Sequence, residues 1–356
     1  MRSKINNMKI LIYGEYSGYG KSLAAGFREL GHEAAVFSPN GDGWKKLDAD
    51  YGLVAKTKIG KLKDLFGLIP IFITFDVIYI MNPSFFSFKL LGPLMLLLFK
   101  LKGIKLFLLC CGDDVEYIKA GESGIINKFV FTGIDYPAIK YFKKTAEKII
   151  NYLCAKAANK IIPTMYDYQA PWKASRFNYK VTEVVPLACY VENIPKIKPT
   201  NTKAIKIMHG INRRDVKGTD VILAALKRIE STFSNVEIYT PEKLSQSEYL
   251  KLFSEIDISI DQCKCHSYGM NAIYAMMHGH VVLAPADEQH CASFNIYKSP
   301  VVSINHDADD IFHKLKILIM SAESLDRLKI ETVDYAARYH KPAHVCNLLL
   351  KIASVK

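Results

Sequence analysis

Short apolar runs alternate with segments of helical periodicity along most of the chain. In the first part, the runs that predict strands are residues 8–13, 34–37, 75–80, 106–109 and 184–187, and a further strand starts at residues 161–162. In the second part, they are residues 204–209, 236–239, 256–260 and 281–284. Uninterrupted apolar runs of this length are typical of buried parallel strands. The two successive alternations predict an α/β protein with two Rossmann-like domains that face each other across a cleft.

A segment without periodicity separates the two alternations. It spans residues 191–203, reads VENIPKIKPTNTK, and is typical of a linker because of its two prolines. We therefore expect an N-terminal domain over residues 1–190 and a C-terminal domain over 204–335. Residues 336–356 predict a last helix, for which packing back on the N-terminal domain is one possible arrangement.

The balance of charge narrows the class of partners. The formal net charge is +12 and the pI about 9.1, which favours anionic partners, although a lysine-rich surface alone gives the same numbers. No motif interleaves aromatic with basic residues, so we expect no nucleic-acid partner. Lysines at 56–63 and 100–105 allow a peripheral contact with an anionic membrane. The most apolar segment, residues 90–109, is interrupted by glycine, proline and lysine, and it predicts a core helix followed by a core strand.

Cysteine usage and the start of the sequence point to a compartment. The eight cysteines are scattered, mostly within apolar runs, and residues 1–7 are polar, without the apolar region of a secretion signal. We expect reduced thiols in a cytoplasmic protein, with the inner face of the membrane as one location. Cys263 and Cys265 precede His266, but no second cluster completes a metal site, so we expect no bound metal.

A glycine-rich loop follows the first strand. Its glycines, Gly14, Gly18 and Gly20, have the spacing G-x3-G-x-G, which differs from the dinucleotide fingerprint G-x-G-x-x-G. We therefore expect no NAD. Two interpretations remain: residues Gly18, Tyr19 and Gly20 let an acceptor approach the backbone closely, or the loop only makes a tight turn.

Two carboxylates follow the strand at residues 106–109. Asp113 and Asp114 come directly after Cys110-Cys111-Gly112, at a strand end where open α/β sheets place their ligands. Either could orient an acceptor hydroxyl in catalysis. The alternative is that one of them caps the next helix.

Basic residues gather in the first loop of the second half. Arg213, Arg214 and Lys217 precede Gly218-Thr219, which begins a helix. Arginine suits bidentate phosphate binding, lysine adds a point charge, and a helix N-terminus adds backbone N–H groups. A second glycine, Gly269, lies in the loop 266–270, which leads into the N-terminus of the next helix. These loops predict a diphosphate site, with a solvated basic loop as the alternative.

The second half resembles family 4 glycosyltransferases of the GT-B fold. The motifs that carry the resemblance are HGINRRDVKGTDVILAAL, then SEIDISIDQ and SYGMNAIYAMMHGHVV, and finally ARYHKPAHVCNLLLKI. They cover most of the second half well, and the first half is similar only loosely. The chain is most similar to the bacterial members that build surface polysaccharides.

The resemblance implies a sugar transfer from a nucleotide-diphosphate donor to a glycan or lipid-linked acceptor, with retention of configuration and no cofactor beyond the nucleotide-sugar co-substrate. The catalytic candidates are Asp113 and Asp114, chosen for their place at a strand end, and His266, which stands where the family has a glutamate that contacts the donor sugar. The donor-binding residues that the resemblance implies are Gly210, Arg213, Arg214, Lys217, Pro241, Lys243, Tyr268, Gly269, Met270, Asn271 and Tyr274.

Three positions depart from the family pattern. His266 and Tyr274 stand where the family has glutamates, and Cys111 stands where it has a histidine. A tyrosine cannot replace the two carboxylate oxygens that hold a ribose. The departures support a second hypothesis, a catalytically impaired GT-B subunit that binds a glycan or a partner enzyme. A GT-B epimerase using the same three catalytic candidates is a remoter alternative.

Overall fold

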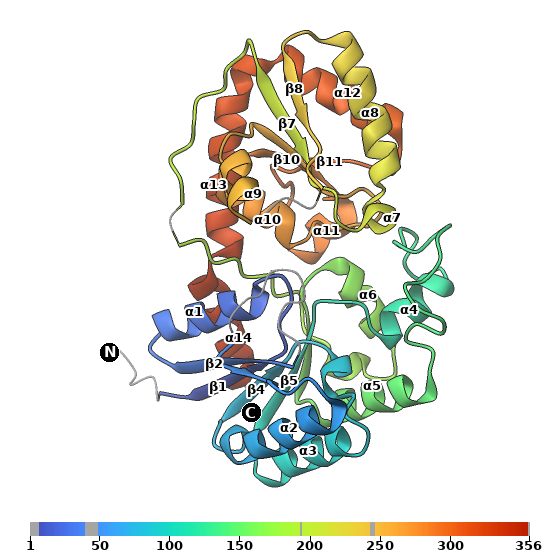
Figure 1. Ribbon diagram of the computed structural model, residues 1–356, viewed down its shortest axis with the longest axis vertical. Coiled ribbons are helices and arrows are strands. Elements are labelled where there is room, and N and C mark those ends of the chain that lie inside the picture. Colours follow the sequence, from blue (N-terminus) through green and yellow to red (C-terminus); the bar gives the residue numbers. More distant parts are fainter. Residues whose placement is uncertain (1–6, 40–48, 193, 243–245, 355–356) are drawn as a thin grey trace. The chain divides into compact units, whose positions relative to one another are not determined.

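Two parallel β-sheets with flanking helices make up the protein (Figure 1). The computed structural model describes residues 7–39, 49–192, 194–242 and 246–354. Unit 1 comprises Met1–Ile126, Tyr136–Tyr190 and Lys341–Lys356. Unit 2 comprises Asn127–Asp135 and Val191–His340. The expected α/β class with two Rossmann-like sheets is confirmed.

The sheet of unit 1 has six parallel strands in the order β3-β2-β1-β4-β5-β6. Their bounds are β1 Lys9–Tyr13, β2 Glu33–Ser38, β3 Tyr51–Gly52, β4 Val77–Ile80, β5 Lys105–Cys110 and β6 Lys160–Pro163. Ile10 pairs with Ala34 on one side and with Val77 on the other, which fixes the register at the centre. The central strands are buried on both faces, as their continuous apolar sequences predict.

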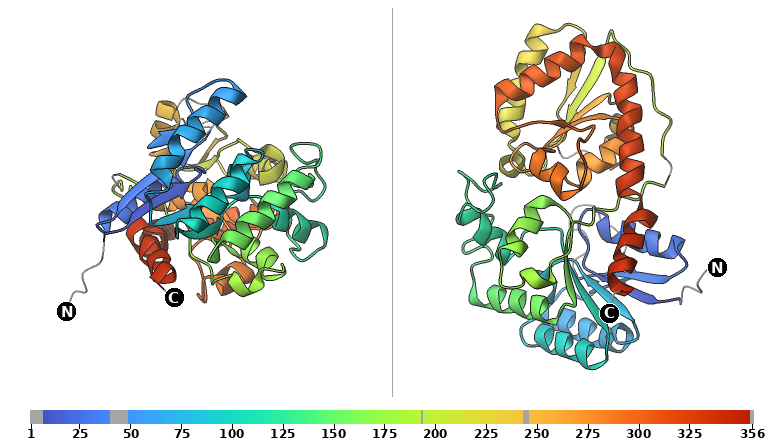
Figure 2. Two further views of the ribbon diagram at one scale, coloured as in Figure 1. Left: turned by 90° about the horizontal axis from the view of Figure 1, so that it is seen from below. Right: turned by 180° about the vertical axis from the view of Figure 1, so that it is seen from behind.

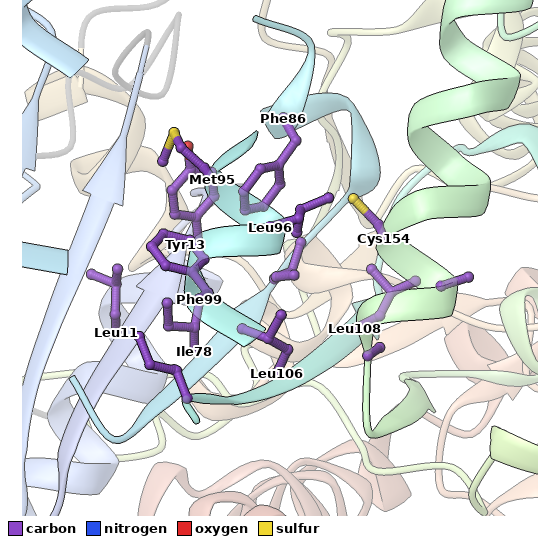
Figure 3. Packing of buried hydrophobic residues seen from close by; sticks show 14 of the residues in the cluster. Leu11, Tyr13, Ile78, Phe86, Met95, Leu96, Phe99, Leu106, Leu108 and Cys154 are labelled. Carbon is purple, nitrogen blue, oxygen red and sulfur yellow. The ribbon is translucent and has the colours of Figure 1, made fainter. Parts of the chain in front are cut away.

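Seven α-helices are described in unit 1. They are α1 Tyr19–Glu29, α2 Lys58–Phe72, α3 Leu91–Leu101, α4 Val115–Glu122, α5 Thr145–Ala157, α6 Tyr166–Lys173 and α14 Pro342–Ser354. Two 3-10 turns are η1 Pro83–Phe86 and η2 Asn178–Lys180. Side chains from α3 and α5, such as Phe99 and Cys154, join strand residues such as Leu106 in one core cluster (Figure 3).

The last helix of the chain, α14, packs against α1 (Figure 2). Gly26 makes this approach possible, because a Cβ atom there would lie 2.6 Å from the backbone of Pro342 and 2.7 Å from Cys346 Sγ. Cys346 Sγ also donates to the carbonyl of Leu23 at 3.3 Å. The helix at the C-terminus is thus part of unit 1.

The sheet of unit 2 has five parallel strands in the order β11-β10-β9-β7-β8. Their bounds are β7 Ile205–His209, β8 Val236–Tyr239, β9 Ile258–Ile260, β10 Val281–Ala284 and β11 Val302–Ser303. The helices are α7 Arg214–Lys217, α8 Thr219–Thr232, α9 Gln246–Phe253, α10 Met270–Met277, α11 Glu288–Ser293, α12 Ala308–Met320 and α13 Leu325–His340, with the 3-10 turn η3 Ala322–Ser324.

One predicted strand is wrong. Residues 184–187 form no strand; the nearby pairing is an isolated bridge between Val181 and Ile161, together with a bond from Val185 N to the carbonyl of Pro163 at 2.9 Å. The chain is held at the edge of β6 but runs away from it before a ladder forms. Within the described ranges, no helix is both long and apolar enough to cross a bilayer.

Candidate functional site

The glycine loop of unit 1 is occupied by a carboxylate of the same chain. Glu15 is 4% exposed. Its Oε1 accepts from Gly18 N at 2.9 Å and from Gly20 N at 3.4 Å, and its Oε2 accepts from Lys21 N at 2.9 Å. Tyr19 packs in the core. These contacts satisfy the N–H groups at the start of α1 and favour the tight-turn interpretation of Gly18, Tyr19 and Gly20 over an acceptor site.

Asp114 caps a helix. It is buried and accepts from Tyr117 N at 2.8 Å and from Trp172 Nε1 at 2.9 Å. Burial raises the pKa of Asp114 to about 7, against the opposing effect of these two hydrogen bonds. Asp113 is half-buried, and its Oδ2 accepts from Tyr141 OH at 3.1 Å. The structure thus gives Asp114 a role in holding α4, the alternative left open by the sequence.

Three elements of unit 2 meet at one buried carboxylate. Asp261, directly after β9, is 2% exposed. Its Oδ1 accepts from Lys217 Nζ of α7 at 2.8 Å and from Asn271 Nδ2 of α10 at 3.1 Å. Lys217 also lies 3.5 Å from the carbonyl of Gly210, after β7. We call Lys217, Asp261 and Asn271 the Asp261 cluster; it ties the basic loop to the start of α10.

The start of α10 presents backbone donors. Its N-cap is Gly269, and no side chain caps it within the described part of the chain. The N–H groups of the first turn, at Met270 and Asn271, therefore have no capping acceptor. Figure 1 shows α7, α10 and α11 at the same end of the sheet of unit 2. A helix N-terminus next to basic side chains is a site suited to a phosphate.

The arginines of the loop are exposed. Arg214 Nε and NH2 both donate to Asp220 Oδ1, at 2.9 and 2.6 Å, so part of the Arg214 charge is balanced. Arg213 lies at the surface before α7. Tyr249 of α9 stands over this end of the sheet: its hydroxyl donates to Asn271 Oδ1 at 3.4 Å. A Cβ atom built on Gly210 would lie 3.8 Å from that hydroxyl.

His266 is held by a carboxylate. Its Nδ1 lies 2.8 Å from Asp287 Oδ2, which also accepts from Lys128 Nζ at 2.7 Å. Burial alone would raise the pKa of Asp287, but the hydrogen bonds from His266 and Lys128 outweigh it and hold this pKa well below its usual range. Asp287 remains a charged anchor, and the imidazole of His266 is fixed in orientation.

Two tyrosines of the expected donor site have other surroundings. Tyr268 is 2% exposed, and its hydroxyl lies 2.9 Å from both Tyr335 OH and His340 Nε2 on α13. Its side chain therefore anchors the loop in the core rather than facing a ligand. Tyr274 is half-buried, with its ring centroid 5.2 Å from that of Phe253.

The remaining predicted residues flank the basic loop. The carbonyl of Pro241 accepts from Ile211 N at 3.0 Å, which places the end of β8 beside the start of the loop. Lys243 lies outside the described residues. All eight cysteines are free thiols. Among the described residues, no group of three or more His, Cys, Asp or Glu side chains is arranged to hold a metal.

Sequence reasoning gave too little weight to three residues of this site. Asp261 and Asp287 each follow a buried strand closely, and a carboxylate at such a strand end is a signal that could have identified both. Tyr249 carries no comparable signal, because its helix brings it to the site only through the tertiary fold.

Comparisons with known proteins show the fold. No protein-family model matches the chain, and no curated protein matches its sequence significantly. Anabaena Alr3699/HepE, solved in complex with UDP-glucose, is similar with a TM-score of 0.61 and 11% identity over 98% of this chain and 100% of that one. Sucrose-phosphate synthase from Thermosynechococcus elongatus gives 0.63 and 11% over 98% of both chains. S. aureus MnaA, solved with UDP, gives 0.54 and 11% over 97% and 96%.

These likenesses extend over nearly the whole chain. The protein therefore has the two-domain α/β fold called GT-B. An identity of 11% establishes this fold and leaves activity to be argued from the site.

Proposed function

We propose that the protein is a glycosyltransferase that takes its sugar from a nucleotide-diphosphate donor bound by unit 2. The observation that carries the proposal is a contrast between two glycine-led helix starts. In unit 1 the loop is filled by Glu15, whereas in unit 2 the start of α10 is uncapped and joined to a basic loop through the Asp261 cluster. This contrast supports an anionic ligand at the start of α10 in unit 2.

In this proposal the diphosphate lies against the backbone N–H groups at Met270 and Asn271. Arg213 supplies charge from the surface. Lys217 supplies a fixed ammonium: of its three N–H donors, one is used by Asp261 at 2.8 Å and one points to Gly210 O at 3.5 Å. In the part of the chain that the structure describes, the third donor is available for a phosphate oxygen. Asp261 holds the ammonium in place, so its reorganisation cost on binding is small.

The chemistry follows from this placement. When the bond between sugar and phosphate breaks, negative charge collects on the leaving diphosphate, and fixed N–H and ammonium donors lower the free energy of that state. We propose retention of configuration, with the leaving phosphate taking the acceptor proton. A separate general base is then unnecessary, which agrees with the use of Asp114 as a helix cap. His266, oriented by Asp287, would contact the donor sugar.

The neighbours support the nucleotide. Alr3699/HepE was solved in complex with UDP-glucose, which is a nucleotide sugar. The name of sucrose-phosphate synthase indicates an enzyme that acts on sugars. We propose a UDP-sugar or related donor and, from the resemblance of the sequence to family 4, an acceptor that is a glycan or lipid-linked saccharide of a surface polysaccharide.

One observation favours the alternative of an impaired subunit. Tyr274 stands where the family has its ribose-binding glutamate, and its ring packs against Phe253 and His278, with centroids 5.2 and 4.2 Å apart. A nucleotide would then be held through its diphosphate alone. Binding of nucleotide without any sugar transfer would favour this alternative.

Calorimetric titration with UDP, GDP and their sugars tests the proposal. We expect one nucleotide to bind, and Arg213→Ala to weaken it about tenfold or more, since a charge-assisted hydrogen bond is lost. Arg228→Ala is the matched control, because Arg228 is an exposed arginine of α8 paired with Asp309. The proposal is wrong if a well-folded wild type binds no nucleotide, or if both variants weaken binding equally.

A further inference from the structure

Two neighbouring helices of unit 1 turn apolar stripes to the outside. On α2 the stripe is Ile59, Leu62 and Phe66, and on α3 it is Leu90, Leu94, Leu97 and Leu101. All seven side chains are between 41% and 79% exposed. Their spacing of three or four residues puts each set on one side of its helix. Figures 1 and 2 show α2 and α3 side by side, and we call the seven residues the leucine face.

The opposite sides of both helices are already used. Leu65 and Phe72 of α2 and Met95 and Phe99 of α3 are buried in the core cluster under the sheet. Both helices therefore carry apolar side chains on the side that faces the core and on a side that faces outward. Seven exposed apolar side chains on two neighbouring helices are typical of an interaction site.

Lysines surround the leucine face. The six exposed lysines of this region are Lys56, Lys58, Lys63, Lys89, Lys100 and Lys102. None of them has an ion-pair partner among the described residues of the chain. Asp64 is the one carboxylate within α2 and α3, and its Oδ2 accepts from Ala55 N at 2.8 Å. The rim is positive, and the residues that carry it are not neutralised by neighbours.

We propose that the leucine face is the contact of this protein with a bilayer that contains anionic lipids. Apolar side chains that enter the acyl boundary, with lysines at the level of the headgroups, match such a surface on both counts. A second copy of the chain would instead bring two lysine rims together, which like-charge repulsion disfavours. This inference does not depend on the donor site, which belongs to unit 2.

The contact lies in the plane of the membrane. At 1.5 Å per residue, the 11 residues of α3 are about 16 Å long, roughly half the thickness of the hydrocarbon core. The helix therefore inserts its leucines and remains folded on the sheet through Met95 and Phe99. Apolar insertion adds a component of binding that salt does not screen, which distinguishes it from attraction through the lysines alone.

Flotation of the full chain with vesicles tests the proposal. The vesicles contain phosphatidylethanolamine with phosphatidylglycerol, or a neutral phosphatidylcholine control. We expect binding to the anionic vesicles at low salt and a retained fraction at high salt. Leu94→Gln/Leu97→Gln should weaken binding about tenfold or more, since two inserted side chains return to water. Ile317→Gln/Met320→Gln on α12 is the control, with two apolar residues that are at least as exposed as Leu94 and Leu97.

Three results would overturn the proposal. One is wild type that ignores anionic vesicles at low salt. Another is a double variant at Leu94 and Leu97 that binds as wild type does. The third is a dimer in sedimentation that this variant abolishes, with no vesicle binding, which would show that a second copy covers the face. Circular dichroism confirms that each variant is folded, and UDP binding by the same samples reports separately on unit 2.

Discussion

The buried pair of Lys217 and Asp261 gives the sharpest test of how the site is built. Lys217→Met removes the ammonium and leaves the carboxylate of Asp261, which is 2% exposed. Among the described residues, its remaining side-chain donor is then Asn271, at 3.1 Å. Breaking one side of a buried ion pair costs about 3–5 kcal/mol in the free energy of unfolding, because the other charge stays buried without compensation. We expect unit 2 to lose stability by this amount.

The double variant Lys217→Met/Asp261→Asn should recover most of the loss. A neutral amide can still accept from Asn271, and no unpaired charge remains, so we expect a free energy of unfolding within about 1–2 kcal/mol of wild type. The coupling energy between the two sites should then be about 2 kcal/mol or more.

Urea titration followed by far-UV circular dichroism measures both quantities. Tryptophan fluorescence separates the units, because Trp172, like the only other tryptophan, Trp44, falls in the residue ranges of unit 1. The reasoning is refuted if Lys217→Met costs less than about 1 kcal/mol, or if the double variant is no more stable than Lys217→Met. The double variant also gives a folded protein without the Lys217 ammonium, in which the contribution of Lys217 to nucleotide binding can be measured.

Three further predictions concern stability. Gly218→Ala should destabilise unit 2 by about 1–3 kcal/mol, because Gly218 has φ of 71° and a Cβ atom there would lie 2.5 Å from Cys263 Sγ. The urea midpoint of unfolding measures this loss of stability, and an unchanged midpoint would contradict the tight packing at Gly218. Gly26→Val should loosen α14 from α1, because the Cβ of residue 26 would lie 2.6 Å from the backbone of Pro342. We expect faster amide hydrogen exchange in α14, and unchanged exchange would show that the packing of the two helices does not depend on this contact. The free energy of unfolding measured against pH tests Asp114. Because the folded pKa of about 7 lies above the unfolded value near 4, stability should fall by roughly 4 kcal/mol as the pH rises from about 4 to 7. Asp114→Asn should remove this pH dependence.

The sheets were predictable because their strands are short and continuously apolar. The expected strands at residues 236–239 and 281–284 coincide with β8 and β10. Strands of two residues, such as β3 and β11, carry too little pattern to be seen in the sequence. The strand predicted at residues 184–187 is absent, because an apolar run can also be buried without pairing to a neighbouring strand.

The start of α1 shows how a local contact moves a boundary. The periodicity predicts a helix from Leu23, whereas α1 begins at Tyr19. Glu15 satisfies the N–H groups of Gly18 and Lys21 and so extends the helix backward. A side chain that caps from outside the periodic segment leaves no mark on the hydrophobic pattern.

The role of α3 could be predicted only in part. The run at residues 90–109 predicts a core helix, and α3 does bury Met95 and Phe99. It also leaves Leu94 and Leu97 exposed, because α3 is an outer helix with the sheet on one side. Hydrophobicity alone does not tell which side of an apolar helix the chain itself covers.

The central claim is that unit 2 binds the diphosphate of a nucleotide. Calorimetry that compares UDP, UMP and uridine tests it most directly on the wild-type protein. Because the contacts proposed for UDP itself, which lacks the transferred sugar, are all to phosphate oxygens, we predict that UDP binds about tenfold or more tightly than UMP, that uridine binds scarcely at all, and that the affinity for UDP falls as salt rises. Equal binding of uridine and UDP, or no binding of UDP or any other nucleoside diphosphate by the folded protein, would contradict the account.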